Sequence, residues 1–136
     1  MTTPSPAAAP ATLRGLRPGD LGWVISRHGQ LYAEEYGWDM RFESLVARIA
    51  ADYLDRLDAT SECAWVAEVD GRSAGCAFVV RARDDGTALV DPGVAQLRML
   101  LVEPWARGRG VGKLLNAESE RFARAAGYRR MRLWTN

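Results

Sequence analysis

The residues best placed to do chemistry lie in segment 107–112, which reads RGRGVG. It follows an apolar run that ends at Val102 and a proline at Pro104, and it leads directly into a stretch with helical periodicity. Glycines allow a backbone to approach an anion closely, and the first N–H groups of a helix lack acceptors within it. The helix dipole favours negative charge at that end, and Arg107 and Arg109 would add charge-assisted hydrogen bonds. The segment therefore predicts a phosphate-binding unit of strand, loop and helix.

Two common phosphate loops do not fit this segment. A Walker A loop needs glycine, four residues, then Gly-Lys-Ser/Thr, but Gly112-Lys113 is followed by leucine and the upstream position is Arg107. A dinucleotide fingerprint needs three glycines in the spacing G-x-G-x-x-G within a βαβ unit. Gly108 and Gly110 match it, but the third position is Lys113. A tight turn from strand to helix with no ligand is the remaining structural alternative.

The elements that must position the loop follow from apolar periodicity and turn residues. Strands are expected at Thr12–Arg17, Cys63–Val69, Ala74–Ala82, Val94–Val102 and Arg129–Thr135. Helices are expected from Asp20, as N-cap, to about Gly37, from Asp39 to about Leu57, and from Val111 to Ala125. Turns are expected at Asp70-Gly71 and Asp84-Asp85-Gly86. The order β-α-α-β-β-β-α-β predicts an α+β fold in which helices flank a mixed, mostly antiparallel sheet.

Composition predicts one domain and excludes several classes of protein. We expect residues 1–11, rich in proline and alanine, to be a disordered tail and residues 12–136 to be the domain. The formal net charge of +1 gives no general attraction to nucleic acid or membranes. No secretory signal and no membrane-length apolar run occur in the sequence, so a cytoplasmic protein is expected.

Three isolated side chains are of types that can react. Cys63 and Cys76 are expected to be two free buried thiols, with a disulfide or a catalytic cysteine as the alternatives. His28, the single histidine, lies on the apolar face of the first helix and is either a core histidine or a general base. Two cysteines and one histidine do not make a metal site, so no metal is expected.

The pattern Val102-x-Pro104-x-x-Arg107-x-x-Gly110-x-Gly112 resembles motif A of the GCN5-related N-acetyltransferases. That motif is Arg/Gln-x-x-Gly-x-Gly/Ala, often preceded by Val-x-Pro, and the element order is also similar. The stretch 19–43 looks like the opening of the acetyltransferase part of fusions that carry a MarR-type regulator. No winged helix is present here, so no DNA binding is expected. The resemblance covers nearly all of residues 12–136.

The resemblance implies an acetyl-CoA-dependent N-acetyltransferase in which an acceptor amine attacks the thioester directly in a ternary complex. In this family the Val-x-Pro strand carries a bulge and splays from the next strand, and the pantetheine arm pairs with its backbone. An N–H at Leu101 would polarise the thioester carbonyl. The cofactor-binding positions implied are Leu100, Leu101 and Val102 for pantetheine, and Arg107, Gly108, Arg109, Gly110, Val111, Gly112 and Lys113 for pyrophosphate. Asn136 matches an asparagine whose amide reaches the pantetheine or the acceptor.

The catalytic groups are less fully specified by the resemblance. The position of the usual carboxylate base is Gln96, which cannot take a proton but can orient a water molecule. Glu35 and Tyr36 lie where the family builds its acceptor site. Glu35 would recognise the acceptor, act as a base through a water molecule, or simply be a solvated or packing group. The usual acid is a tyrosine on a helix after the last strand, and this sequence ends at Asn136. We therefore expect a fold that lacks the last helix and two strands, and a homodimer could cover the edge strand.

A small amine or amino acid is the expected acceptor. A non-catalytic acyl-CoA-binding or regulatory module, or an inactive fragment, is the alternative to an enzyme.

Overall fold

A computed structural model describes residues 10–84, 88–89 and 91–133 of the chain. Its elements are β1 (Thr12–Arg14), α1 (Asp20–Tyr36), α2 (Met40–Asp55), β2 (Cys63–Val69), β3 (Arg72–Arg81), β4 (Arg83–Asp84), β5 (Ala88–Leu89), β6 (Val94–Val102), the 3₁₀ turn η1 (Pro104–Ala106), α3 (Val111–Ala125) and β7 (Arg130–Leu133). This order confirms the predicted α+β class. A disordered tail was expected at residues 1–11, and residues 1–9 of it lie outside the described part of the chain.

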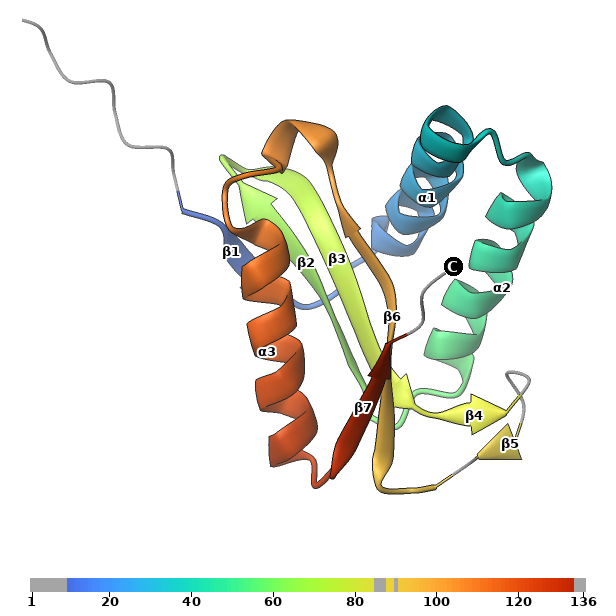
Figure 1. Ribbon diagram of the computed structural model, residues 1–136, viewed down its shortest axis with the longest axis vertical. Coiled ribbons are helices and arrows are strands. Elements are labelled where there is room, and N and C mark those ends of the chain that lie inside the picture. Colours follow the sequence, from blue (N-terminus) through green and yellow to red (C-terminus); the bar gives the residue numbers. More distant parts are fainter. Residues whose placement is uncertain (1–9, 85–87, 90, 134–136) are drawn as a thin grey trace, which may run out of the picture.

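The main sheet has five strands in the order β1-β2-β3-β6-β7. The pairs β1–β2, β2–β3 and β3–β6 are antiparallel, whereas β7 pairs with β6 in parallel. Figure 1 shows α3 on one face of this sheet and α1 and α2 on the other. The β6–α3–β7 segment is therefore a crossover connection, and the loop that links β6 to α3 lies at one end of the sheet.

Both faces of the sheet are buried, because α3 covers one face and α1 and α2 cover the other. Successive side chains of the central strands point to these two faces in turn. On the α3 side, Val79 and Leu97 pack with Val111 and Leu115. On the α1/α2 side, Cys76 and Phe78 pack with Val24, Leu31, Val46 and Leu101. This explains why β3 reads as a nearly continuous apolar run rather than as an alternating one.

The start of α1 differs from the prediction. Gly19, at a φ of +97°, takes the N-cap position, and Asp20 is the first helical residue. The Asp20 carboxylate instead accepts hydrogen bonds from the Arg17 backbone N–H at 2.7 Å and from the Arg14 guanidinium at 2.7 and 3.1 Å. Because this carboxylate binds the chain between β1 and α1, the first strand ends at Arg14 rather than at Arg17.

Sequence periodicity also missed one small feature. β4 and β5 form a separate two-stranded sheet, and two residues per strand are too few to produce a pattern. The turn predicted there at Asp84-Asp85-Gly86 falls mostly outside the described residues. The Asp70-Gly71 turn is confirmed, since both residues have positive φ values of 53° and 75°. Within the described ranges, no helix is both long and apolar enough to cross a bilayer.

Candidate functional site

The loop between β6 and α3 has the backbone of an anion site. Gly108 and Gly110 have φ values of +83° and +78°, which residues other than glycine rarely adopt. Gly110 is the N-cap of α3, and its carbonyl accepts the Leu114 N–H at 2.9 Å. The N–H groups before Leu114 are those that an α-helix leaves without an acceptor. The loop therefore turns the first N–H groups of α3 outward.

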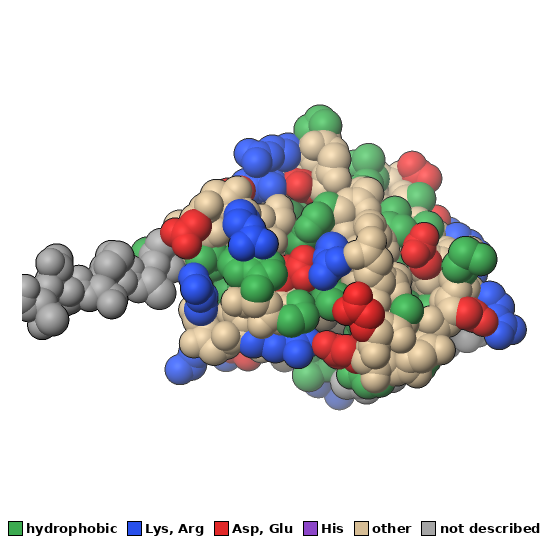
Figure 2. All heavy atoms as spheres, turned by 90° about the horizontal axis from the view of Figure 1, so that it is seen from above, with side chains coloured by type: hydrophobic (Ala, Val, Ile, Leu, Met, Phe, Trp, Pro, Cys, Tyr) green, Lys and Arg blue, Asp and Glu red, His purple; other side chains and the backbone are tan. Residues whose placement is uncertain are grey.

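Basic side chains surround this helix end. Arg107, Arg109 and Lys113 are exposed, and in the view from above, basic and acidic side chains lie side by side (Figure 2). The Arg107 guanidinium contacts the Glu35 carboxylate at 2.6 Å, and Arg109 lies 3.9 Å from Asp70. Arg107 is thus paired with a carboxylate that an anionic ligand could replace, and Arg109 lies near a second carboxylate.

The strand that leads to the loop carries a bulge at Met99. Met99 has a φ of 52°, and the β3–β6 register shifts between Cys76 and Phe78, so that one extra residue is inserted in β6. The Met99 carbonyl accepts a hydrogen bond from the Cys76 thiol at 3.2 Å. Burial raises the pKa of that thiol, while a backbone hydrogen bond from Leu101 acts in the opposite direction. Cys76 is therefore a protonated donor that supports the bulge.

Beyond the bulge, β6 has one strand neighbour among the described residues. β7 pairs with β6 from Val94 to Leu97 and no further, whereas β3 follows β6 to Val102. Segment 98–102 therefore has no strand on its β7 side within the described part of the chain. Leu100 is exposed there, while Leu101 is buried on the α1/α2 side.

A close approach of β3 to β6 fixes this geometry. A Cβ atom on Gly75 would lie 2.6 Å from the Leu101 carbonyl oxygen and 3.0 Å from a Val111 methyl group. Gly75 is consequently required where β3, β6 and α3 meet. Sequence analysis placed this residue in a strand and gave it no further role, because nothing local marks such a contact.

Glu103, the middle residue of the Val-x-Pro motif, supports the structure next to the loop, which the sequence did not predict. It is buried, and its two carboxylate oxygens accept hydrogen bonds from Arg27 of α1, both at 2.7 Å. Its N–H donates to the Ala74 carbonyl at 2.8 Å. The pair attaches α1 to the end of β6, and Glu103 is the main reason that the pKa of Arg27 is raised. One sequence signal was available: Glu103 lies next to an apolar strand, and a carboxylate that becomes buried there needs a cation as its partner.

The two predicted catalytic residues are not brought together. Glu35 lies at the C-terminal end of α1, beside the loop, whereas Gln96 lies in the first half of β6, at the opposite end of the sheet (Figure 1). Gln96 is buried, lines a cavity of about 400 Å³ against α2, and accepts a hydrogen bond from Arg132 at 2.9 Å. The predicted Asn136 contact lies outside the described residues.

The other candidate groups have structural surroundings. His28 is 2 % exposed, and its Nδ1 lies 2.8 Å from the Val24 carbonyl, which fits the core interpretation. Burial lowers the pKa of His28. Cys63 and Cys76 are free thiols, as expected, but only Cys76 is buried, whereas Cys63 is partly exposed. Among the described residues, no group of three His, Cys, Asp or Glu side chains is arranged to hold a metal ion.

The chain is similar to proteins of known family. Residues 27–136 match the model of the acetyltransferase (GNAT) family. None of the curated protein sequences matches the chain.

Several solved structures share the fold. A GNAT-family acetyltransferase from Staphylococcus aureus has a TM-score of 0.71 at 15 % identity, over 92 % of this chain and 73 % of its own. A GNAT-family acetyltransferase from Brucella melitensis, in complex with acetyl-CoA, has a TM-score of 0.69 at 21 % identity, over 93 % and 76 %. The aminoglycoside N-acetyltransferase AAC(6')-Iy, in complex with CoA, has a TM-score of 0.65 at 22 % identity, over 97 % and 81 %. At these identities the likeness concerns the fold.

Proposed function

The chain belongs to the acetyltransferase (GNAT) family, and on that premise we propose that it transfers an acetyl group from acetyl-CoA to the amine of a small molecule or amino acid. The amine nitrogen attacks the thioester carbonyl carbon in a ternary complex, the C–S bond breaks, and an amide forms. The acceptor loses a proton, and the sulfur leaves as the thiol of CoA.

The observation that carries this proposal is the loop from Arg107 to Lys113. Two glycines with left-handed φ values turn the N-terminus of α3 outward, and three basic side chains surround it. Backbone N–H groups, a helix dipole and guanidinium groups are together suited to a pyrophosphate. The pyrophosphate of acetyl-CoA would replace the Glu35 carboxylate as the partner of Arg107.

The thioester would lie along the open edge of β6. Segment 98–102 lacks a strand on its β7 side among the described residues, which leaves backbone groups of Leu100, Leu101 and Val102 for the amide groups of pantetheine. The bulge at Met99 turns this stretch away from the regular ladder. The Leu101 N–H hydrogen-bonds the Cys76 thiol on the β3 side, so it would have to exchange this partner for the thioester carbonyl in order to polarise it. Asn136 would contact the pantetheine or the acceptor.

We assign supporting roles to the two predicted catalytic residues. Glu35, close to the loop on α1, would recognise the acceptor ammonium or accept its proton through water. Gln96 would orient the acceptor or a water molecule from the cavity that it lines.

A second candidate is a module that binds acyl-CoA without turnover. The observation that favours it is the Gln96 side chain, which stands at the position of the usual base and whose oxygen is already engaged by Arg132. Such a module would keep the loop and lack acid–base groups.

One experiment separates these functions. The protein is incubated with acetyl-CoA and a panel of primary amines, and CoA and acetylated product are quantified by chromatography, while calorimetry measures acetyl-CoA binding. Amine-dependent release of CoA supports the enzyme. Binding with no release on any amine supports the second function, and absence of binding contradicts both.

A further inference from the structure

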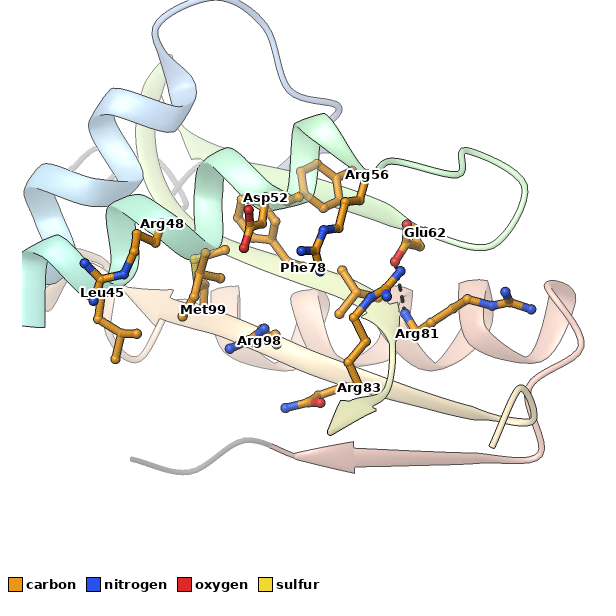
Figure 3. Close-up of a pocket in the computed structure, with 14 residues that line it drawn as sticks. Leu45, Arg48, Asp52, Arg56, Glu62, Phe78, Arg81, Arg83, Arg98 and Met99 are labelled. Carbon is orange, nitrogen blue, oxygen red and sulfur yellow. Dashed lines mark hydrogen bonds between the residues drawn. The ribbon is translucent and has the colours of Figure 1, made fainter. Parts of the chain in front are cut away.

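The cavity beside Gln96 has a surplus of positive charge. It lies between α2 and strands β3 and β6, and Figure 3 shows the residues that line it. Arginines reach it from three parts of the chain: Arg48 in α2 and Arg56 at the C-cap of that helix, Arg83 in β4, and Arg98 in β6. Arg81 also belongs to the lining, but its side chain points away from the cavity (Figure 3). A surface that gathers four guanidinium groups is suited to an anion.

Two carboxylates line the same cavity and do not balance this charge. Glu62 accepts hydrogen bonds from the backbone N–H groups of Asp58 and Arg81, at 3.0 and 3.1 Å, so its oxygens are engaged by the chain. Asp52 reaches down from α2 toward Arg98 (Figure 3) and is the nearer counter-charge. The lining therefore keeps a net positive charge.

Arg98 is less exposed than the two arginines at the rim of the cavity. It is half-buried on β6, whereas Arg48 and Arg56 are exposed at the rim. Burial and the neighbouring Arg132 both lower the pKa of Arg98, and Asp52 opposes them. A charged guanidinium in such surroundings gains from any further anion that binds within hydrogen-bonding distance.

The cavity also lies close to the proposed site of acetyl transfer. Arg98 and the bulge residue Met99 come directly before Leu100. Three extended residues would span ~10 Å at ~3.3 Å each, and the bulge at Met99 makes the distance from Arg98 to Leu101 along the strand shorter than this. Phe78, Val80 and Met99 give the lining an apolar part that can pack against methylene groups. A short molecule could therefore reach both the arginines and the thioester.

We propose that the acceptor is an amine that carries a carboxylate, and that the carboxylate binds in this cavity against Arg98 with Arg48 and Arg56 at the rim. The amine then points along β6 toward Leu101. This inference rests on the proposed acetyltransferase function and narrows its acceptor to one class. A polycationic amine would be repelled by the same arginines. Aminoglycosides, which appear in the name of one structural neighbour, are amines of this kind.

The test compares amines that differ by one carboxylate. β-Alanine and propylamine, γ-aminobutyrate and butylamine, and L-glutamate and L-glutamine are assayed with acetyl-CoA, together with spermidine. We expect kcat/KM at least tenfold higher for the more acidic member of at least one pair, and spermidine to be the poorest acceptor. Equal or reversed rates within every pair would overturn the proposal.

Variants locate the effect. Arg98→Gln should raise KM for the preferred acceptor at least tenfold and leave KM for acetyl-CoA within twofold, while Arg98→Lys should restore part of the affinity. Arg121→Gln removes an exposed arginine on α3, on the other face of the sheet, and should change neither constant. If thermal unfolding shows that Arg98→Gln does not fold, Arg48→Gln at the rim provides the same comparison. An unchanged acceptor KM in the folded variant contradicts the proposal.

Calorimetry separates this inference from the function on which it rests. Each amine is titrated into protein saturated with CoA. Binding of a carboxylate-bearing amine that is lost in Arg98→Gln, without any turnover, supports the cavity and contradicts the enzyme. Turnover with no carboxylate preference supports the enzyme and contradicts the cavity. Absence of binding by every amine contradicts the cavity and gives the enzyme no support.

Discussion

The carboxylate of Glu35 lies 2.6 Å from the guanidinium of Arg107, although 72 residues separate them in the chain. Glu35 lies in the last turn of α1 and Arg107 begins the glycine loop, so the ion pair joins the end of α1 to that loop. Both side chains are more than one-third exposed, so the pair itself adds about 0–1 kcal/mol to stability. Its interest is functional, because a phosphate bound as we propose would compete with the Glu35 carboxylate for one guanidinium.

Replacing Glu35 tests the role that we assign to its carboxylate. Glu35→Gln should lower kcat at least tenfold, because general-base groups typically contribute factors of ~10²–10⁴. Acetyl-CoA should bind as tightly or more tightly, since Arg107 is released from its partner. Steady-state kinetics and calorimetry measure the two effects, with Glu34→Gln on the same helix as control. An unchanged kcat with tighter acetyl-CoA binding would reduce Glu35 to a partner of Arg107.

Arg107 should matter for acetyl-CoA rather than for the acceptor. Removing one charge-assisted hydrogen bond costs about 1.5–3 kcal/mol, so Arg107→Gln should raise the acetyl-CoA Kd at least ~10-fold. The loss should shrink as salt is added, because exposed charges are screened. Calorimetry at low and high salt checks this, with Arg121→Gln as the matched arginine. A Kd within twofold of the wild type would show that the loop does not bind the pyrophosphate through this side chain.

The Glu103–Arg27 pair should contribute to folding. Glu103→Gln leaves Arg27 without its carboxylate, and because Arg27 is 26 % exposed, we expect a loss of about 1–3 kcal/mol rather than the full cost of breaking a buried pair. Urea unfolding of Glu103→Gln, Arg27→Met and the double variant gives the coupling between the two residues. Additive losses would mean that the two side chains stabilise the fold independently.

His28 should make stability depend on pH. Burial lowers the pKa of folded His28 below the ordinary value of 6.5, so in the window just below that value the unfolded chain binds a proton that the folded chain does not. Stability should therefore fall as pH decreases from 7 to 5, by up to ~1.4 kcal/mol per pH unit. Urea unfolding at pH 7, 6 and 5 should show this slope for the wild type and lose it in His28→Gln. An identical slope in the variant would assign the effect to other groups.

The local structure of this chain was largely predictable from its sequence. The ends of β2 and β6 coincide with the predicted apolar runs, and α3 has the predicted bounds, because these signals depend on neighbouring residues alone. The glycine loop was predictable for the same reason, since positive φ at Gly108 and Gly110 is a property of the residue type. Asp20 was assigned wrongly as an N-cap, because its actual partner, Arg14, belongs to another element.

The sequence by itself therefore determined the α+β order of elements, the glycine loop at the start of α3 and the family resemblance of that loop. The tertiary structure alone decided that Arg27 meets Glu103, that Gly75 must admit the Leu101 carbonyl, and that Arg98 faces the arginines of α2 across a cavity. The physical reason is distance along the chain. Periodicity and propensity act between residues a few positions apart. The partner of a charged side chain, or the lining of a cavity, depends instead on which distant segments the sheet brings face to face.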